Sequence, residues 1–129
     1  MKLNPVCIRD VLIFFEANLA FGEDLSWVPI SLNELCTNFP KYSKEELAYT
    51  LLLLDEACYI EANIINRDGG ILSIYVYRLT YSGHEFLDTI KSDTVWKKLQ
   101  NAIGSVGSIS LPVILNLGSH YAIELLTRI

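Results

Sequence analysis

The dipeptide Asp68-Gly69 constrains the fold of this chain more than any other short segment. It lies between two β-prone runs, YIEANIIN at residues 59–66 and ILSIYVYRL at residues 71–79. An Asp-Gly pair between such runs is typical of a type I′ turn, which joins two antiparallel strands. The sequence therefore predicts a β-hairpin over residues 59–79.

The register of this hairpin decides which side chains face the core. A two-residue turn pairs Ile65 with Leu72 and Ala62 with Tyr75. The predicted core face is Ile60, Ala62, Ile64, Tyr75, Tyr77 and Leu79, and the predicted outer face is Ile65, Leu72, Ile74 and Val76, edged by Glu61, Asn63 and Arg78. A turn shifted by one residue would exchange the faces. Both faces are apolar, so the outer one must be covered by the last helix or by a partner.

The chain before the hairpin begins with a helix signal. Asn4-Pro5 supplies an N-cap side chain and a proline at the first helical position, and the helix is expected to end at Gly22. The segment SWVPI at residues 26–30 then predicts a brief edge strand, because Pro29 has no amide hydrogen to donate to a ladder.

Two capping boxes predict two further helices. SLNE at residues 31–34 opens a short helix that ends before Pro40, and SKEE at residues 43–46 opens a longer one that ends near Cys58. In each box the serine hydroxyl and the glutamate three positions later satisfy amide hydrogens that the first helical turn leaves unpaired.

Two helices are expected after the hairpin. Thr80 caps the first, and Gly83 lets it pack closely after the strand. The run GSVGS at residues 104–108 marks a break, and SLP at residues 110–112 starts a last helix that runs to the C-terminus. Apolar residues cover most of that helix: Ile109, Leu111, Val113, Ile114, Leu115, Leu117, Ile123, Leu125 and Leu126. Such a helix is buried on several sides, either across a dimer axis or by folding back over the hairpin.

The expected order is helix, short strand, helix, helix, hairpin, helix, helix. Three helices followed by a two-stranded wing form the winged helix-turn-helix arrangement, and the short strand would complete a three-stranded sheet with the wing. The predicted fold class is mainly α with a small antiparallel sheet (α+β). Residues 1–79 would form the winged-helix core, with the wing at 59–79, and residues 80–129 a C-terminal helical extension that packs on the same domain.

Three segments resemble a small bacterial and prophage winged-helix family that is catalogued only as a domain of unknown function. They are ELAYTLLLLDEACYIEA, YRLTYSGHEFLDTIKSDTVWKKL and SLPVILNLGSHYA, and the pattern LT..GHEFLD.I..D..W.K is the most specific part. The resemblance covers roughly residues 43–125 and implies a winged-helix fold in a phage or mobile-element setting. It implies no catalytic residues. The shorter LT..G piece is also similar to the exit from the wing in MarR-type regulators.

The third predicted helix argues against DNA binding. In DNA-binding winged helices this helix enters the major groove. Here it carries Lys44 against four acidic residues, Glu45, Glu46, Asp55 and Glu56, in a chain of net charge −5. Its predicted core stripe is Leu47, Leu51, Leu54 and Cys58, and its opposite face is Glu45, Tyr49, Leu52 and Glu56. Phosphates would be repelled before base contacts could form.

Two His–carboxylate pairs are the candidates for chemistry. His84 with Asp88 (Glu85 lies between them) and His120 with Glu124 share a four-residue spacing, which places each pair on one helical face. A metal or proton-transfer site would use them, but such pairs also stabilise helices directly, and no recognised ligand spacing supports a metal. We therefore favour the interpretation that both pairs stabilise their helices, and we expect no metal or cofactor.

Two other clusters have competing interpretations. The tyrosines Tyr42, Tyr49, Tyr75, Tyr77 and Tyr81 suit stacking on single-stranded bases, but without interleaved Lys or Arg they are better read as core-edge residues. One basic cluster surrounds Trp96 and consists of Lys91, Lys97 and Lys98. These lysines could contact phosphate, but we favour the interpretation that they form a solvated helix face around a buried tryptophan.

The three cysteines, Cys7, Cys36 and Cys58, lie in apolar stretches without zinc spacing, and they predict buried free thiols in a reducing compartment. Neither end of the chain has the pattern of a signal peptide or a membrane span, so a cytoplasmic location is expected.

The predicted function is a non-catalytic regulator or adaptor that acts through protein–protein contacts, either with a partner or as a homodimer. Its predicted interface is Tyr49, Leu52, Glu56, Ile65, Leu72, Ile74 and Val76. The alternative is a DNA-binding transcriptional regulator, whose predicted DNA contacts are Lys41, Lys44, Arg67, Lys97 and Lys98.

Overall fold

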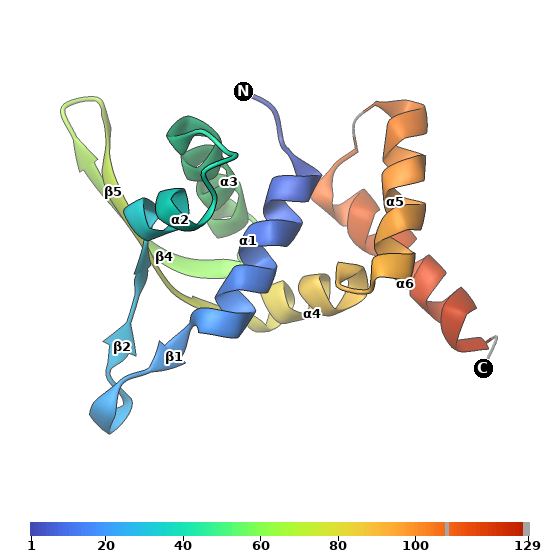
Figure 1. Ribbon diagram of the computed structural model, residues 1–129, viewed down its shortest axis with the longest axis horizontal. Coiled ribbons are helices and arrows are strands. Elements are labelled where there is room, and N and C mark those ends of the chain that lie inside the picture. The colour runs from blue at the N-terminus through green and yellow to red at the C-terminus, as the bar shows by residue number, and fades with distance from the viewer. Residues whose placement is uncertain (108, 128–129) are drawn as a thin grey trace. The chain divides into compact units, whose positions relative to one another are not determined.

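The computed structural model describes residues 1–107 and 109–127, and these divide into two compact units (Figure 1). Unit 1 comprises residues 1–84 and unit 2 residues 85–129. The predicted boundary after Leu79 lies five residues before this division. The reason is local: the Thr80 hydroxyl donates to the Cys58 carbonyl oxygen and Gly83 packs on Tyr59, so the first turn of the next helix belongs to unit 1.

Unit 1 confirms the expected order of helices, short strand and hairpin. Its elements are α1 (Pro5–Asn18), β1 (Ala20–Phe21), the short 3-10 helix η1 (Glu23–Leu25), β2 (Trp27–Val28), β3 (Ile30–Ser31), α2 (Leu32–Asn38), α3 (Lys44–Glu56), β4 (Ile60–Arg67) and β5 (Gly70–Leu79). The strands β3, β5 and β4 form one antiparallel sheet in that order. The predicted fold class, mainly α with a small antiparallel sheet, is confirmed.

The three predicted helix starts in unit 1 are confirmed. The Asn4 side chain accepts from the Val6 and Cys7 amides, at 3.1 and 3.3 Å. Ser31 and Ser43 each accept from the amide three residues later, at 3.2 and 3.1 Å. Each cap satisfies a donor that the helix itself cannot pair.

One predicted helix end is wrong. The first helix ends at Asn18 rather than at Gly22, because Leu19 is already extended and the next two residues form a strand. The third helix ends at Glu56, near Cys58 as predicted, and Cys58 takes a left-handed conformation with φ +62°. Its side chain is exposed, so it does not belong to the core stripe; of the three cysteines, only Cys7 is fully buried.

The hairpin turn is where it was predicted, but the register changes along the strands. Arg67 pairs with Gly70, as an Asp-Gly turn requires. Ile65 then pairs with Ser73, not Leu72, and Ala62 with Val76, not Tyr75, because β5 carries an extra residue at each of two irregularities. Each bulge moves the following side chains to the other face.

The bulges overturn the predicted faces of β5. Ile74 and Val76, which were placed on the outer face, are fully buried, whereas Tyr75 and Tyr77 are only half-buried. Ile65 and Leu72 remain exposed at the end of the hairpin. The core of unit 1 therefore combines one face of the sheet with the buried sides of α1, α2 and α3: Cys7, Ile8, Val11, Leu12, Phe15, Leu32, Leu35, Leu47, Leu51, Leu54, Ile60, Ile74, Val76 and Leu79.

A polar network joins the start of α1 to the start of α3. Asn4 donates to Glu46 at 2.6 Å, and the Tyr42 hydroxyl donates to Asp10 at 2.6 Å. Beneath them the Thr50 hydroxyl donates to the Cys7 sulfur at 3.4 Å. Burial raises the pKa of the Cys7 thiol to about 11, so it stays protonated at neutral pH.

Replacing Tyr42 with phenylalanine tests this network. Burial, then the hydrogen bond to Asp10, raise the pKa of Tyr42 in the folded state. The stabilisation is therefore fully present below the unfolded-state pKa of about 10 and is lost as pH rises through the folded-state value. Because Tyr42 is half-exposed, we expect Tyr42→Phe to lower the free energy of unfolding by only roughly 1 kcal/mol at pH 7.

Urea unfolding of both proteins between neutral pH and strongly alkaline pH measures this difference. It should be constant near neutrality and should shrink in strong alkali. A difference that grows with pH would contradict the assignment of the phenol as the donor.

Unit 2 contains more helix breaks than were predicted. The helix that follows the hairpin, α4 (Tyr81–Ile90), crosses the boundary between the units and stops at Lys91, and a separate helix, α5 (Asp93–Val106), begins after it. The cause is Ser92, whose hydroxyl accepts from the Val95 amide and caps α5. Gly107, with φ +86°, ends α5 as expected for the glycine-rich break.

The last helix, α6 (Leu111–Thr127), is less buried than its composition predicts. Leu111, Ile114 and Gly118 are buried, and a Cβ at Gly118 would lie 2.8 Å from the Thr89 methyl group. Val113, Ile123 and Leu126 are exposed in this single chain. The predicted continuation to the C-terminus lies outside the described residues. Among the residues described, no helix is both long and apolar enough to cross a membrane.

Candidate interaction site

The predicted interface residues do not form one exposed surface. Tyr49 and Leu52 are half-buried on α3, Glu56 is exposed, and Ile65 and Leu72 are exposed on the hairpin. Ile74 and Val76 belong to the core, and so their assignment to an interface is wrong. Leu72 lines a small cavity of about 150 Å³ together with Lys44, which was predicted as a DNA contact under the alternative.

The predicted DNA contacts belong to different elements of the chain. Lys41 forms an ion pair with Asp10 at 3.1 Å and lies over the Tyr42 ring. Lys44 is exposed at the start of α3, and Arg67 is exposed at the hairpin turn. Lys97 and Lys98 are in unit 2, where Lys98 lies 3.6 Å from Glu124.

The His–carboxylate pairs are surface features. His84, Glu85 and Asp88 are exposed on α4. His120 lies 3.6 Å from Glu124, as the four-residue spacing predicts. Within residues 1–107 and 109–127, no group of three or more His, Cys, Asp or Glu side chains is placed to hold a metal ion.

The most distinctive surface of unit 1 is an arm that the sequence did not predict. We call residues 20–28, which comprise β1, η1 and β2, the aromatic arm; Figure 1 shows it projecting away from α1, α2 and α3. Ala20 pairs with Val28 and Phe21 with Trp27. The Gly22 amide donates to the Ser26 carbonyl at 2.8 Å and closes the tip.

The tip of the aromatic arm has an unusual backbone. Asp24 and Leu25 both have positive φ, at +55° and +61°, which is costly for residues other than glycine. A Cβ at Gly22 would lie 2.8 Å from the Ser26 hydroxyl and 2.9 Å from a Val28 methyl group. The backbone and the close contacts at Gly22 thus hold the tip of the arm in one tight loop.

Large apolar side chains of the arm are open to solvent. Phe21 is 57% exposed, Trp27 49%, Val28 52% and Leu25 75%. The Phe21 and Trp27 rings lie 5.1 Å apart, and Trp27 meets the Tyr77 ring edge-to-face at 6.2 Å. Tyr77 is the extra residue in one bulge of β5, and bulges commonly re-aim a side chain beside a functional site.

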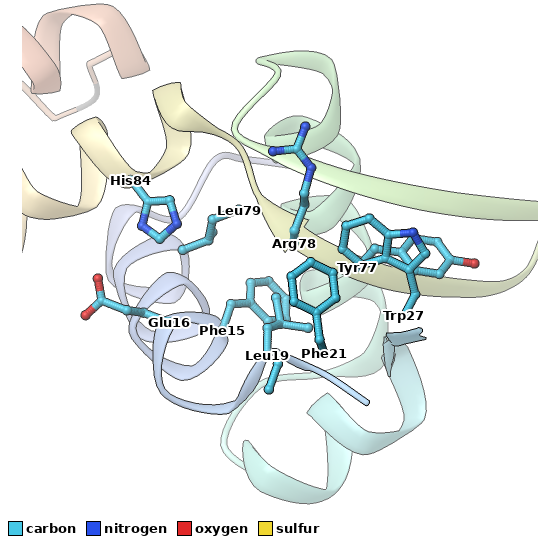
Figure 2. Close-up of a pocket in the computed structure, with 10 residues that line it drawn as sticks. Phe15, Glu16, Leu19, Phe21, Trp27, Tyr77, Arg78, Leu79 and His84 are labelled. Atoms are coloured by element: carbon cyan, nitrogen blue, oxygen red, sulfur yellow. The ribbon is translucent and has the colours of Figure 1, made fainter. Parts of the chain in front are cut away.

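A cavity of about 260 Å³ lies between the arm, α1 and the end of β5. Figure 2 shows its side chains, with Glu16 and His84 at one end and Trp27 and Tyr77 at the other. Phe15, Leu19, Phe21 and Leu79 form the apolar part between them. The Arg78 side chain is held by Glu61, with Nε 2.6 Å from a carboxylate oxygen. The cavity is therefore an apolar slot with polar side chains at one end and aromatic rings at the other.

The sequence held a weak signal for this site. The segment AFGEDLSWV has an aromatic residue on each side of a glycine and two acidic residues, as a short hairpin would. Each strand has only two residues, which is too few for an alternating pattern to be recognised. His84 drew attention as half of a chemical pair, but in the structure it borders this slot.

Comparison with known proteins identifies the family. Residues 2–110 match the family described as "Hypothetical protein (DUF2513)". The chain belongs to this family. A relative from Haemophilus influenzae, titled "Uncharacterized protein", is 33% identical over 105 residues, which cover 81% of this chain and 80% of the relative. No solved structure matches the chain. The family match covers residues 2–84 of unit 1, including the aromatic arm and the slot.

Proposed function

We propose that this DUF2513 chain is a non-catalytic winged-helix adaptor or regulator that acts through protein–protein contacts. The order of helices, short strand and hairpin in unit 1 supports the winged-helix part of this proposal. The resemblance seen in the sequence adds the proposal of a phage or mobile-element setting in the bacterial cytoplasm.

The observation that carries the proposal is the exposed aromatic arm. Exposed apolar side chains scattered singly are ordinary, but a contiguous group beside a slot is typical of a binding surface. Trp and other aromatic residues are also enriched among the side chains that dominate protein interfaces. Here Phe21 and Trp27 touch each other on a short projecting hairpin, and about half of each side chain is open to solvent.

The surface of α3 supports a protein partner over DNA. Glu45 and Glu56 are exposed, Glu46 and Asp55 are half-buried, and Lys44 is the helix's basic residue. A helix of this charge is repelled by phosphate along the path that a recognition helix would take. Of the predicted DNA contacts in unit 1, Lys41 already lies beside Asp10.

A titration with random-sequence duplex DNA tests the alternative. We expect no salt-dependent binding at micromolar protein and low ionic strength, and no change for Lys44→Glu. Affinity that falls steeply with salt, and that Lys44→Glu weakens, would establish the DNA-binding regulator in place of the adaptor.

Affinity purification of the full chain from a native host tests the adaptor directly. We expect a protein to be recovered in proportion to the bait, and its recovery to survive nuclease treatment. Recovery that disappears with nuclease would contradict the proposal. Sedimentation of the purified chain tests homodimer formation separately, since a monomer at micromolar concentration would leave only a different protein as the partner.

A further inference from the structure

The sheet of unit 1 has an open edge at the end of β5. On one side, β5 pairs with β4 as far as Leu79 opposite Ile60. On the other side, β3 pairs with β5 only at Val76 and Tyr75. Pro29 immediately precedes β3 and cannot donate to a ladder, and β2 before it pairs with β1 instead. Residues 77–79 therefore have no strand beside them on this side within the described part of the chain.

The apolar slot runs along this open edge. Tyr77, Arg78 and Leu79 form one wall, and Phe21 and Trp27 of the arm lie across from it. The volume of about 260 Å³ falls below the roughly 300–1,000 Å³ of a typical small-molecule pocket. Its size suits one large side chain presented by a neighbouring backbone.

The charges around the slot define the chemistry of the occupant. Glu23 and Asp24 are exposed at the tip of the arm. Arg78 is paired with Glu61, which offsets its charge. The tip of the arm beside the slot is therefore acidic, and it favours a basic partner over nucleic acid. They also disfavour a second copy of this chain, because two acidic arms would repel each other.

We propose that the slot binds an extended segment of a partner protein, which adds as a strand to β5 at residues 77–79. The segment places one aromatic or large aliphatic side chain between Phe21, Trp27 and Leu79, and its flanking residues are Lys or Arg. Unpaired backbone groups on a strand edge supply affinity in this mode, and the slot supplies specificity. The inference rests on the proposed function and names the partner's chemistry.

A library of random linear peptides displayed on phage, selected against the full chain, tests the proposal without a known partner. We expect enrichment of peptides with an aromatic or large aliphatic residue flanked by basic residues. In ¹⁵N NMR spectra, an enriched peptide should shift the amides of residues 77–79 and the Trp27 indole signal. Enrichment of acidic peptides, or peptides that leave these signals unmoved, would overturn it.

Matched variants separate the slot from the rest of the surface. Trp27→Ala should weaken peptide binding by about tenfold or more, as expected when an aromatic anchor is lost. Leu72→Ala removes a similarly exposed apolar side chain, 53% exposed against 49%, from the hairpin, and it should bind as the wild type does. The double variant Glu23→Lys, Asp24→Lys should weaken binding at low salt and much less at high salt. Thermal unfolding of each variant checks that the fold is retained. If the Trp27 and Leu72 variants lost peptide affinity equally, the slot would not be the binding site.

Backbone pairing has its own test. N-methylation of alternate amides in an enriched peptide removes the donors that a strand would use, and it should abolish binding in one of the two alternations. If the peptide still bound with either set of alternate amides methylated, strand addition would be excluded.

Failure of this inference is distinguishable from failure of the adaptor proposal. A nuclease-resistant partner recovered equally by wild type and Trp27→Ala would retain the adaptor and exclude the slot. If recovery depends on nucleic acid, the adaptor proposal itself fails.

Discussion

Gly83→Ala is expected to destabilise unit 1 strongly. A Cβ at residue 83 would lie 1.9 Å from the Tyr59 carbonyl oxygen and 2.9 Å from its carbonyl carbon. These are backbone atoms, and the segment is held by the hydrogen bonds from Thr80 to Tyr59 and Cys58. Neither side can give way cheaply, so we expect a loss of more than about 3 kcal/mol in the free energy of unfolding. That is a large share of the roughly 5–15 kcal/mol that holds a domain together.

Urea unfolding followed by circular dichroism measures this loss, and Gly104→Ala is the matched control. Gly104 lies in α5, and a Cβ there would meet nothing within 4 Å. Alanine should stabilise that helix by about 0.5–1 kcal/mol, because glycine loses more backbone entropy on folding. If Gly83→Ala were as stable as Gly104→Ala, the close approach of α4 to Tyr59 would be wrong.

Ile74→Asp should prevent folding, whereas Leu72→Asp should be tolerated. Ile74 is 0% exposed on the core side of the sheet, and an aspartate there would bury a charge without a partner. We expect a cost of at least about 4 kcal/mol. Leu72, two residues away, is 53% exposed, and a charge there should change stability by about 0.5 kcal/mol or less.

The pair tests the observed register against the uninterrupted one. With an uninterrupted ladder, Ile74 and Leu72 would share the outer face, and both substitutions would be tolerated equally. Circular dichroism spectra and soluble yield of the two variants distinguish these outcomes. Similar behaviour of the two proteins would argue for the uninterrupted register.

The elements that could be predicted are those specified by contacts between near neighbours in the chain. Asn4, Ser31 and Ser43 each bond amides within three residues, and so their positions identify helix starts without knowledge of the rest. The Asp68-Gly69 turn is equally local. Ser92 gives the same kind of signal before α5, yet the apolar pattern across residues 78–96 obscured it.

The register and the binding surface depend on contacts that are distant in sequence. Both faces of the hairpin strands carry apolar residues, so alternation could not reveal the bulges, and packing of Ile74 and Val76 against the helices decides between the faces. The aromatic arm depends on Tyr77 meeting Trp27 across 50 positions. Strands of two residues are too short for an alternating hydrophobic pattern that would predict such a contact.

The bulges also have a consequence for how copies of this chain avoid aggregation. A long, flat strand edge is a template on which further chains stack into fibrils. The outer edge of the sheet is β4, whose eight residues face ten in β5, so the hairpin bends rather than lying flat. Glu61, Asn63 and Arg67 are exposed along β4, and charged or polar groups discourage stacking. The open edge of β5 is only three residues long: room for a bound peptide, but too short to seed a growing fibril.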